Sequence, residues 1–155
     1  MVRAIAAIVA ATSLCGACGG DGPLSHHAHA REASQICRRL SAHADDTVLP
    51  DFDRPRDAAR AIEQEVERQR GVLAELRDLE PPKVETTAVV RWLALIDQLL
   101  DEAELMVDQL RGDDPARALE TAARLAALDA RGRMLAREQD IHPCRFPYVA
   151  VSADG

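Results

Sequence analysis

The sequence predicts an all-α protein that folds as an up-down four-helix bundle. Apolar residues recur at spacings of three and four in four separate segments, which is typical of amphipathic helices. The prolines fall outside these segments or in their first turns. The chain of 155 residues is 47% hydrophobic but only 3% aromatic, so its core must be built from Leu, Ile, Val and Ala. Such a composition favours packed helices over a β-sandwich.

The first helix is expected over residues 30–44 and the second over residues 55–80. The apolar row of the first helix comprises Ala33, Ile36, Cys37, Leu40 and Ala44. The row of the second comprises Ala59, Ile62, Val66, Leu73 and Leu76, with the polar Gln69 among them. Asp53 is the predicted N-cap of the second helix, and Pro55 suits its first turn because a missing N–H costs nothing there. Pro81 ends this helix.

The third helix has the most regular pattern, and a short link joins it to the fourth. Its row comprises Val89, Leu93, Ile96, Leu100, Ala103, Val107 and Leu110. Gly112 is the predicted left-handed C-cap, Asp113 or Asp114 the next N-cap, and Pro115 the start of a helix that runs to about Asp140. Its inward residues are Ala118, Ala122, Leu125, Leu128 and Leu135, and Gly132 permits close approach to a neighbour. So short a link predicts an antiparallel hairpin.

Residues 1–17 have the order of a secretory signal peptide: a basic start at Arg3, an apolar stretch and then small residues. The following Leu-Cys-Gly-Ala-Cys-Gly-Gly resembles the lipobox of bacterial lipoproteins. By that resemblance Cys18 carries the lipid and Ala17 precedes the cleavage site, although Cys15 stands where the lipobox has Leu. Ordinary secretion and a Cys15–Cys18 redox pair are the alternatives. Residues 18–29 are expected to form a flexible tether.

The layout of the whole chain resembles small helical lipoproteins of high-GC bacteria. A tether precedes a bundle domain over residues 30–149, cysteines lie near both ends of that domain, and residues 150–155 form a disordered tail. Lys83 is the only lysine among 19 basic residues, which agrees with a GC-rich genome. The resemblance implies a lipid anchor in the cell membrane or outer membrane, on the extracytoplasmic side, and implies no particular activity.

Two cysteines remain once Cys15 leaves with the signal peptide and Cys18 is blocked by lipid. Cys37 and Cys144 are then an even pair in an oxidising compartment, where disulfides persist. We expect them to bond to each other and to join the first helix to the segment after the last one. Closing a loop of roughly 100 residues stabilises a fold by up to about 4.7 kcal/mol in the chain-entropy model. Two buried free thiols are the alternative.

Helix 89–110 carries an acidic row of Asp97, Asp101, Glu104 and Asp108, which needs counter-charges because like charges at this spacing repel. In an antiparallel hairpin Asp108 lies level with Arg117, and Asp101 lies level with Arg124. Ion pairs between these residues, beside a solvated face, are one interpretation. A carboxylate cation site or a binding strip for a basic partner is the other.

His26, His27 and His29 form the one local cluster with metal-ligand character, because imidazoles suit Zn²⁺, Cu²⁺ and Ni²⁺. A flexible tether fixes no coordination geometry, however, so solvated histidines are the competing interpretation. No metal site or other cofactor is therefore predicted. A calcium loop from Asp51 is rejected because its sixth position is Arg56 and its twelfth is Ile62.

The sequence contains no motif that names a reaction, so we do not expect an enzyme. The net charge of −7 makes the chain a poor match for nucleic acid, whose binding proteins need clustered positive charge. We expect a lipid-anchored, non-catalytic module that binds or spaces components of the cell envelope. Its expected partners are the membrane, through the covalent lipid, and an envelope protein. The alternative is an envelope carrier of metal or haem that uses the tether histidines, with His142 and Tyr148 as further ligands.

Overall fold

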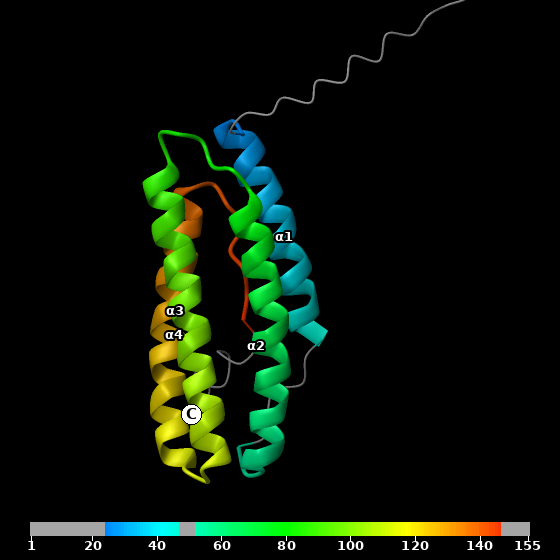
Figure 1. Ribbon diagram of the computed structural model, residues 1–155, viewed down its shortest axis with the longest axis vertical. Helices are drawn as coiled ribbons and strands as arrows, with labels where there is room; N and C mark the ends of the chain where they lie inside the picture. Colours follow the sequence, from blue (N-terminus) through cyan, green and yellow to red (C-terminus); the bar gives the residue numbers. More distant parts are fainter. Residues whose placement is uncertain (1–23, 47–51, 147–155) are drawn as a thin grey trace, which may run out of the picture.

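The computed structural model describes residues 24–46 and 52–146, and these residues form an all-α four-helix bundle. The helices are α1 (His26–Asp46), α2 (Pro55–Asp78), α3 (Thr86–Arg111) and α4 (Pro115–Glu138). Consecutive helices run in opposite directions (Figure 1), so the predicted up-down topology is confirmed. None of the described helices is both long and apolar enough to cross a membrane. The predicted signal peptide, Cys15, Cys18 and the tail from residue 150 lie outside the described residues.

Helix α1 begins at His26, four residues before the predicted start at Ala30. The hydroxyl of Ser25 accepts a hydrogen bond from the backbone N–H of Ala28 at 3.3 Å, which is an N-terminal cap. The Ser25 carbonyl also accepts from the N–H of His29. The predicted tether is therefore too long at its C-terminal end, because its last four residues belong to the helix.

Helix α2 buries every apolar residue that the pattern predicted, and it buries Gln69 as well. The predicted cap was wrong, because Arg54 and not Asp53 occupies the N-cap position, and its side chain makes no capping bond. Pro55 stands at the first helical position, as predicted. The φ angle that proline fixes starts this helix without a capping side chain.

Helix α3 is buried on a wider face than its apolar row indicated. Trp92, Leu95, Leu99 and Met106 are buried in addition to the predicted residues, while Leu93 is only partly buried. This second row exists because α3 packs closely against both α2 and α4. At its end the predicted left-handed Gly112 was wrong: Gly112 has a φ of −76°, and Asp113 adopts the left-handed conformation at 58°.

Helices α3 and α4 form the predicted antiparallel hairpin. The side chain of Asp114 accepts a hydrogen bond from the N–H of Arg117 and caps α4, and Pro115 follows at the first helical position. Gly132 allows the close approach that was expected of it. A methyl group at this position would lie 3.1 Å from the Cδ2 atom of Leu95.

The segment that follows α4, residues 139–146, turns back and packs along the inside of the bundle (Figure 1). Ile141, Cys144 and Phe146 are buried, with exposed fractions of 2%, 5% and 8%. The N–H of His142 donates a hydrogen bond to the hydroxyl of Ser34 at 2.7 Å. The segment therefore contributes apolar side chains to the core and a polar contact to α1.

The predicted disulfide is present: the sulfur atoms of Cys37 and Cys144 are 2.01 Å apart. Both cysteines belong to the same apolar cluster as the buried residues of all four helices. Helix α1 packs against α2 much less extensively than α3 packs against either α2 or α4. The disulfide therefore connects the least closely packed helix to the C-terminal segment.

Candidate functional site

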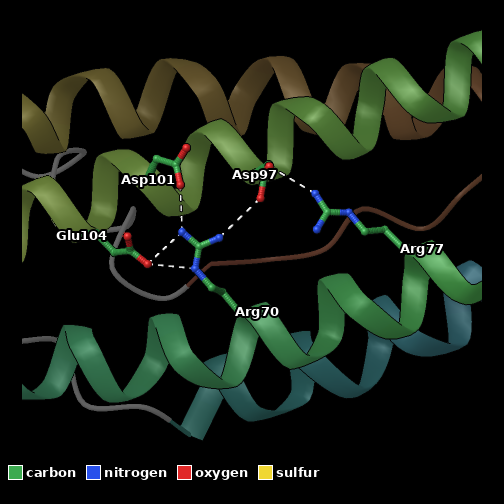
Figure 2. Close-up of polar contacts among 5 residues, drawn as sticks. All are labelled: Arg70, Arg77, Asp97, Asp101 and Glu104. Atoms are coloured by element: carbon green, nitrogen blue, oxygen red, sulfur yellow. Dashed lines mark hydrogen bonds and ion pairs between the residues drawn. The ribbon is translucent and has the colours of Figure 1, made fainter.

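The acidic row of α3 lies against two arginines of α2 (Figure 2). One Arg70 nitrogen contacts carboxylate oxygens of both Asp101 and Glu104 at 2.8 Å, and another lies 3.4 Å from Asp97. Arg77 binds the second oxygen of Asp97 at 3.1 Å. Helix α2 therefore supplies counter-charges to three members of the acidic row, Asp97, Asp101 and Glu104.

This α2–α3 ion network stabilises the cationic form of Arg70. Hydrogen bonding to Asp101, followed by bonding and charge interactions with Glu104, raises the pKa of Arg70 above its ordinary value. The side chain of Arg70 is 38% exposed and that of Asp101 is 65% exposed. Exposed ion pairs each contribute only about 0–1 kcal/mol, so the network orients α2 against α3 more than it stabilises the fold.

The predicted pairs Asp101–Arg124 and Asp108–Arg117 are wrong. Arg124 binds Glu102 at 3.0 Å, and Arg117 contacts Asp114 at 3.5 Å on its own helix. Asp101 binds Arg70 instead, and Asp108 has no ion pair within the described part of the chain.

The rotation of α3 about its axis explains this correction. Leu95, Glu102 and Gln109 face α4: they contact the positions of Gly132, Arg124 and Thr121, respectively. Their spacing of seven marks one face of a helix. The acidic row falls on the neighbouring face, which α2 covers. The predicted pairs failed because the register along a hairpin does not specify which face of α3 a residue occupies.

A groove of about 480 Å³ lies between α2 and α3, in the half of the bundle farther from residue 24. Its lining consists of Glu63, Val66, Glu67, Arg70, Glu104, Val107, Asp108 and Arg111. The two valines are buried and form an apolar floor, whereas the charged residues form the rim. We call this hollow the α2–α3 groove.

The rim of the α2–α3 groove has an excess of negative charge, with four carboxylates and two guanidinium groups. Arg111 pairs with Glu63 at 2.5 Å, and Arg70 is occupied by the ion network. Glu67 and Asp108 are exposed and have no ion pair among the described residues. These two carboxylates could therefore bind a cationic ligand over an apolar floor.

His26 joins three segments at the other end of the bundle. Its Nδ1 atom lies 2.8 Å from Glu85, the N-cap residue of α3, and its Nε2 atom lies 3.0 Å from Asp140, which follows α4. Both ring nitrogens can donate to carboxylates only when the imidazole is protonated. Hydrogen bonding to Glu85 and then to Asp140 accordingly raises the pKa of His26.

The three predicted histidines do not converge on one point. Because Glu85 and Asp140 bind opposite nitrogens of His26, they share no position for a metal ion with it. His29 is buried, and desolvation lowers its pKa, while His27 is exposed. No group of three His, Cys, Asp or Glu residues within 24–46 and 52–146 is arranged to hold a metal ion. Tyr148 lies outside the described residues.

The sequence reasoning did not identify two buried carboxylates. Glu65 is 3% exposed and accepts a hydrogen bond from Gln69 at 2.7 Å, which explains the polar residue in the apolar row of α2. Asp129 is 2% exposed and pairs with Arg133 at 2.5 Å. Burial raises the pKa of Asp129. Each of these two carboxylates falls on the inner face of a predicted helix, and this position is the sequence feature that could have identified them.

Comparison with known proteins gives no relative: no protein-family model matches the chain, and neither a curated protein nor a solved structure is significantly similar to it.

A double-mutant cycle tests the α2–α3 ion network. We expect Arg70→Met, which keeps the apolar stem, and Asp101→Asn to show a coupling free energy of about 0.5–1 kcal/mol in urea unfolding. The matched control combines Asp101→Asn with Arg124→Met, for which coupling near zero is expected. Coupling between Asp101 and Arg124, with none between Asp101 and Arg70, would contradict this assignment of the pairs.

The pH dependence of stability tests the contacts of His26. Since folding raises the pKa of His26 above its ordinary value of 6.5, its stabilising contribution is full below that value and is lost as pH rises through the folded pKa. The free energy of unfolding of the native protein should therefore exceed that of His26→Gln at about pH 5.5, and the difference should shrink above about pH 7.

The control for this comparison is His27→Gln, which alters the exposed neighbour of His26. It should give a difference from the native protein that does not vary with pH in the same way. A His26→Gln difference that stays constant from acid to alkaline pH would refute the proposed protonation of His26.

Proposed function

We propose that the protein is a lipid-anchored, extracytoplasmic module of the bacterial cell envelope that binds a cationic partner segment and catalyses no reaction. The anchor is proposed on Cys18, in the lipobox-like sequence. The observation that carries the binding function is the α2–α3 groove, where Glu67 and Asp108 stand over the apolar floor of Val66 and Val107.

The disulfide supports a location outside the cytoplasm. Disulfides persist in oxidising compartments and are rare where thiols are kept reduced. Cys37 and Cys144 are both buried, so their bond is shielded from solvent thiols. A structural disulfide of this kind fits an exported protein.

The shape and charge of the groove favour a partner that is both apolar and basic. An amphipathic helix of the partner could place its apolar side chains on the floor and its lysines or arginines against the rim. Opposite charges at the rim would speed encounter and select against acidic partners. We therefore place a basic amphipathic segment of an envelope protein in this groove.

Fatty-acid labelling tests the anchor. When the full chain is produced in a bacterium that is fed a radioactive fatty acid, we expect label in the native protein and none in Cys18→Ser. Cys15→Ser is the matched control and should keep the label, because the proposed lipid is attached to the other cysteine. Label that is absent from the native protein, or retained in Cys18→Ser, would refute the anchor.

Peptide binding tests the groove. The probe is a fluorescent helical peptide with leucines on one face and lysines on the other, added to the full-chain protein in detergent. We expect Glu67→Gln combined with Asp108→Asn to weaken binding about tenfold, or about 1.4 kcal/mol.

The control variant removes two exposed acids elsewhere on the surface, Asp78→Asn and Glu120→Gln. This change alters the net charge equally and should leave the affinity within about twofold. If both double variants weaken binding by the same factor, the peptide is responding to overall charge and the groove is not its site.

A further inference from the structure

A second hollow, of about 590 Å³, lies between the end of α4 and the C-terminal segment. Its lining consists of Ala130, Arg133, Arg137, His142, Pro143 and Arg145. We call it the arginine pocket. Its charged side chains are all basic, in a protein whose net charge is −7.

One carboxylate, Asp129, interacts with this lining through Arg133 and Arg145. Asp129 is buried and pairs with Arg133. Arg137 is exposed and has no ion pair among the described residues. Arg137 therefore leaves one guanidinium group without an ion pair among the described residues, in a lining whose ionisable side chains are all basic.

Two rigid elements hold the basic groups around the pocket. Arg133 and Arg137 are four residues apart on α4, so they lie on the same face of the helix. His142 and Arg145 belong to the C-terminal segment, which is fixed by the bond from the His142 N–H to Ser34 and by the disulfide at Cys144. The backbone positions of the pocket are thus set before any ligand binds, which limits the entropy that binding would cost.

We propose that the arginine pocket binds a phosphate-type oxyanion. Guanidinium groups present paired N–H donors that match phosphate oxygens, and they remain charged at every physiological pH. The phosphate can belong to a free phosphate compound or to the headgroup of an anionic lipid. This site is separate from the α2–α3 groove, so it can exist whether or not the groove binds a peptide.

The position at which the described chain begins would bring lipid headgroups close to the arginine pocket. His26 contacts Asp140, so the described chain begins beside the end of α4. Leu24 lies six positions after Cys18, a distance of at most about 22 Å in an extended chain. If Cys18 carries the proposed anchor, headgroups lie within reach of the arginine pocket. Only the lipid source of the phosphate rests on the proposed function; the oxyanion site itself does not.

The experiment follows the guanidinium N–H and His142 NMR signals of the full-chain protein at physiological salt. One arm adds inorganic phosphate in neutral detergent. The other places the protein in phosphatidylcholine nanodiscs with or without phosphatidylglycerol. We expect signals of Arg133, Arg137 and His142 to shift in at least one arm, while chloride at equal ionic strength leaves them unchanged.

Arg137→Gln should weaken the response at least tenfold, and it should leave thermal unfolding unchanged because Arg137 is exposed. Arg131→Gln is the matched control: it removes an exposed arginine of α4 that does not line the pocket. A response to phosphate alone assigns a free phosphate compound, and a response to phosphatidylglycerol alone assigns a headgroup. No response in either arm, or equal losses in Arg137→Gln and Arg131→Gln, overturns the proposal.

Should Arg137→Gln unfold, Arg145→Gln provides the same comparison from the other wall of the pocket. Inorganic phosphate should also protect the native protein against thermal unfolding, since a ligand that binds only the folded state stabilises it. If fatty-acid labelling shows no lipid on the protein but phosphate still binds, the proposed membrane location is rejected and the proposed oxyanion site is retained.

Discussion

The packing of the C-terminal segment between α1 and the other helices is the constraint on which this structure depends. Helix α1 packs less extensively against α2 than α3 packs against α2 or α4. Its middle is held instead by the Cys37–Cys144 bond and by Ser34, which accepts from His142. Ile141 and Phe146 complete the apolar contacts of the segment. Helix α1 and the C-terminal segment therefore each cover apolar surface of the other.

The same arrangement separates two regions of opposite charge. The C-terminal segment supplies His142 and Arg145 to the arginine pocket, in the half of the bundle nearer the start of the described chain. The α2–α3 groove, with its acidic excess, lies in the other half. A protein attached through the segment before α1 would present its basic pocket toward the attachment and its acidic groove away from it.

The fold could be predicted because its main signals are local. The spacing of apolar residues, the prolines at 55 and 115 and the short link at 112–114 depend on a few neighbouring residues each. Local signals did not place every helix boundary correctly. Ser25 was not recognised as a cap, so the start of α1 was placed too late. The disulfide could be predicted from elimination among four cysteines, without any knowledge of distance.

The charged sites depend on rotation and long-range packing, which the sequence pattern does not specify. The acidic row of α3 was found, but its partners lie on α2, because α4 occupies the adjacent face. The arginine pocket combines residues of α4 with residues of the segment that folds back over it. His26 binds carboxylates 59 and 114 positions away in the chain. No periodicity within one segment indicates such contacts.

Native-state hydrogen exchange of the oxidised and the reduced protein tests the role of the C-terminal segment most directly. If that segment holds α1 in place, reduction should accelerate exchange selectively in α1 and in residues 139–146, while the α3–α4 hairpin keeps its protection. Equal acceleration in all four helices, or unchanged protection of α1 after complete reduction, would contradict this account.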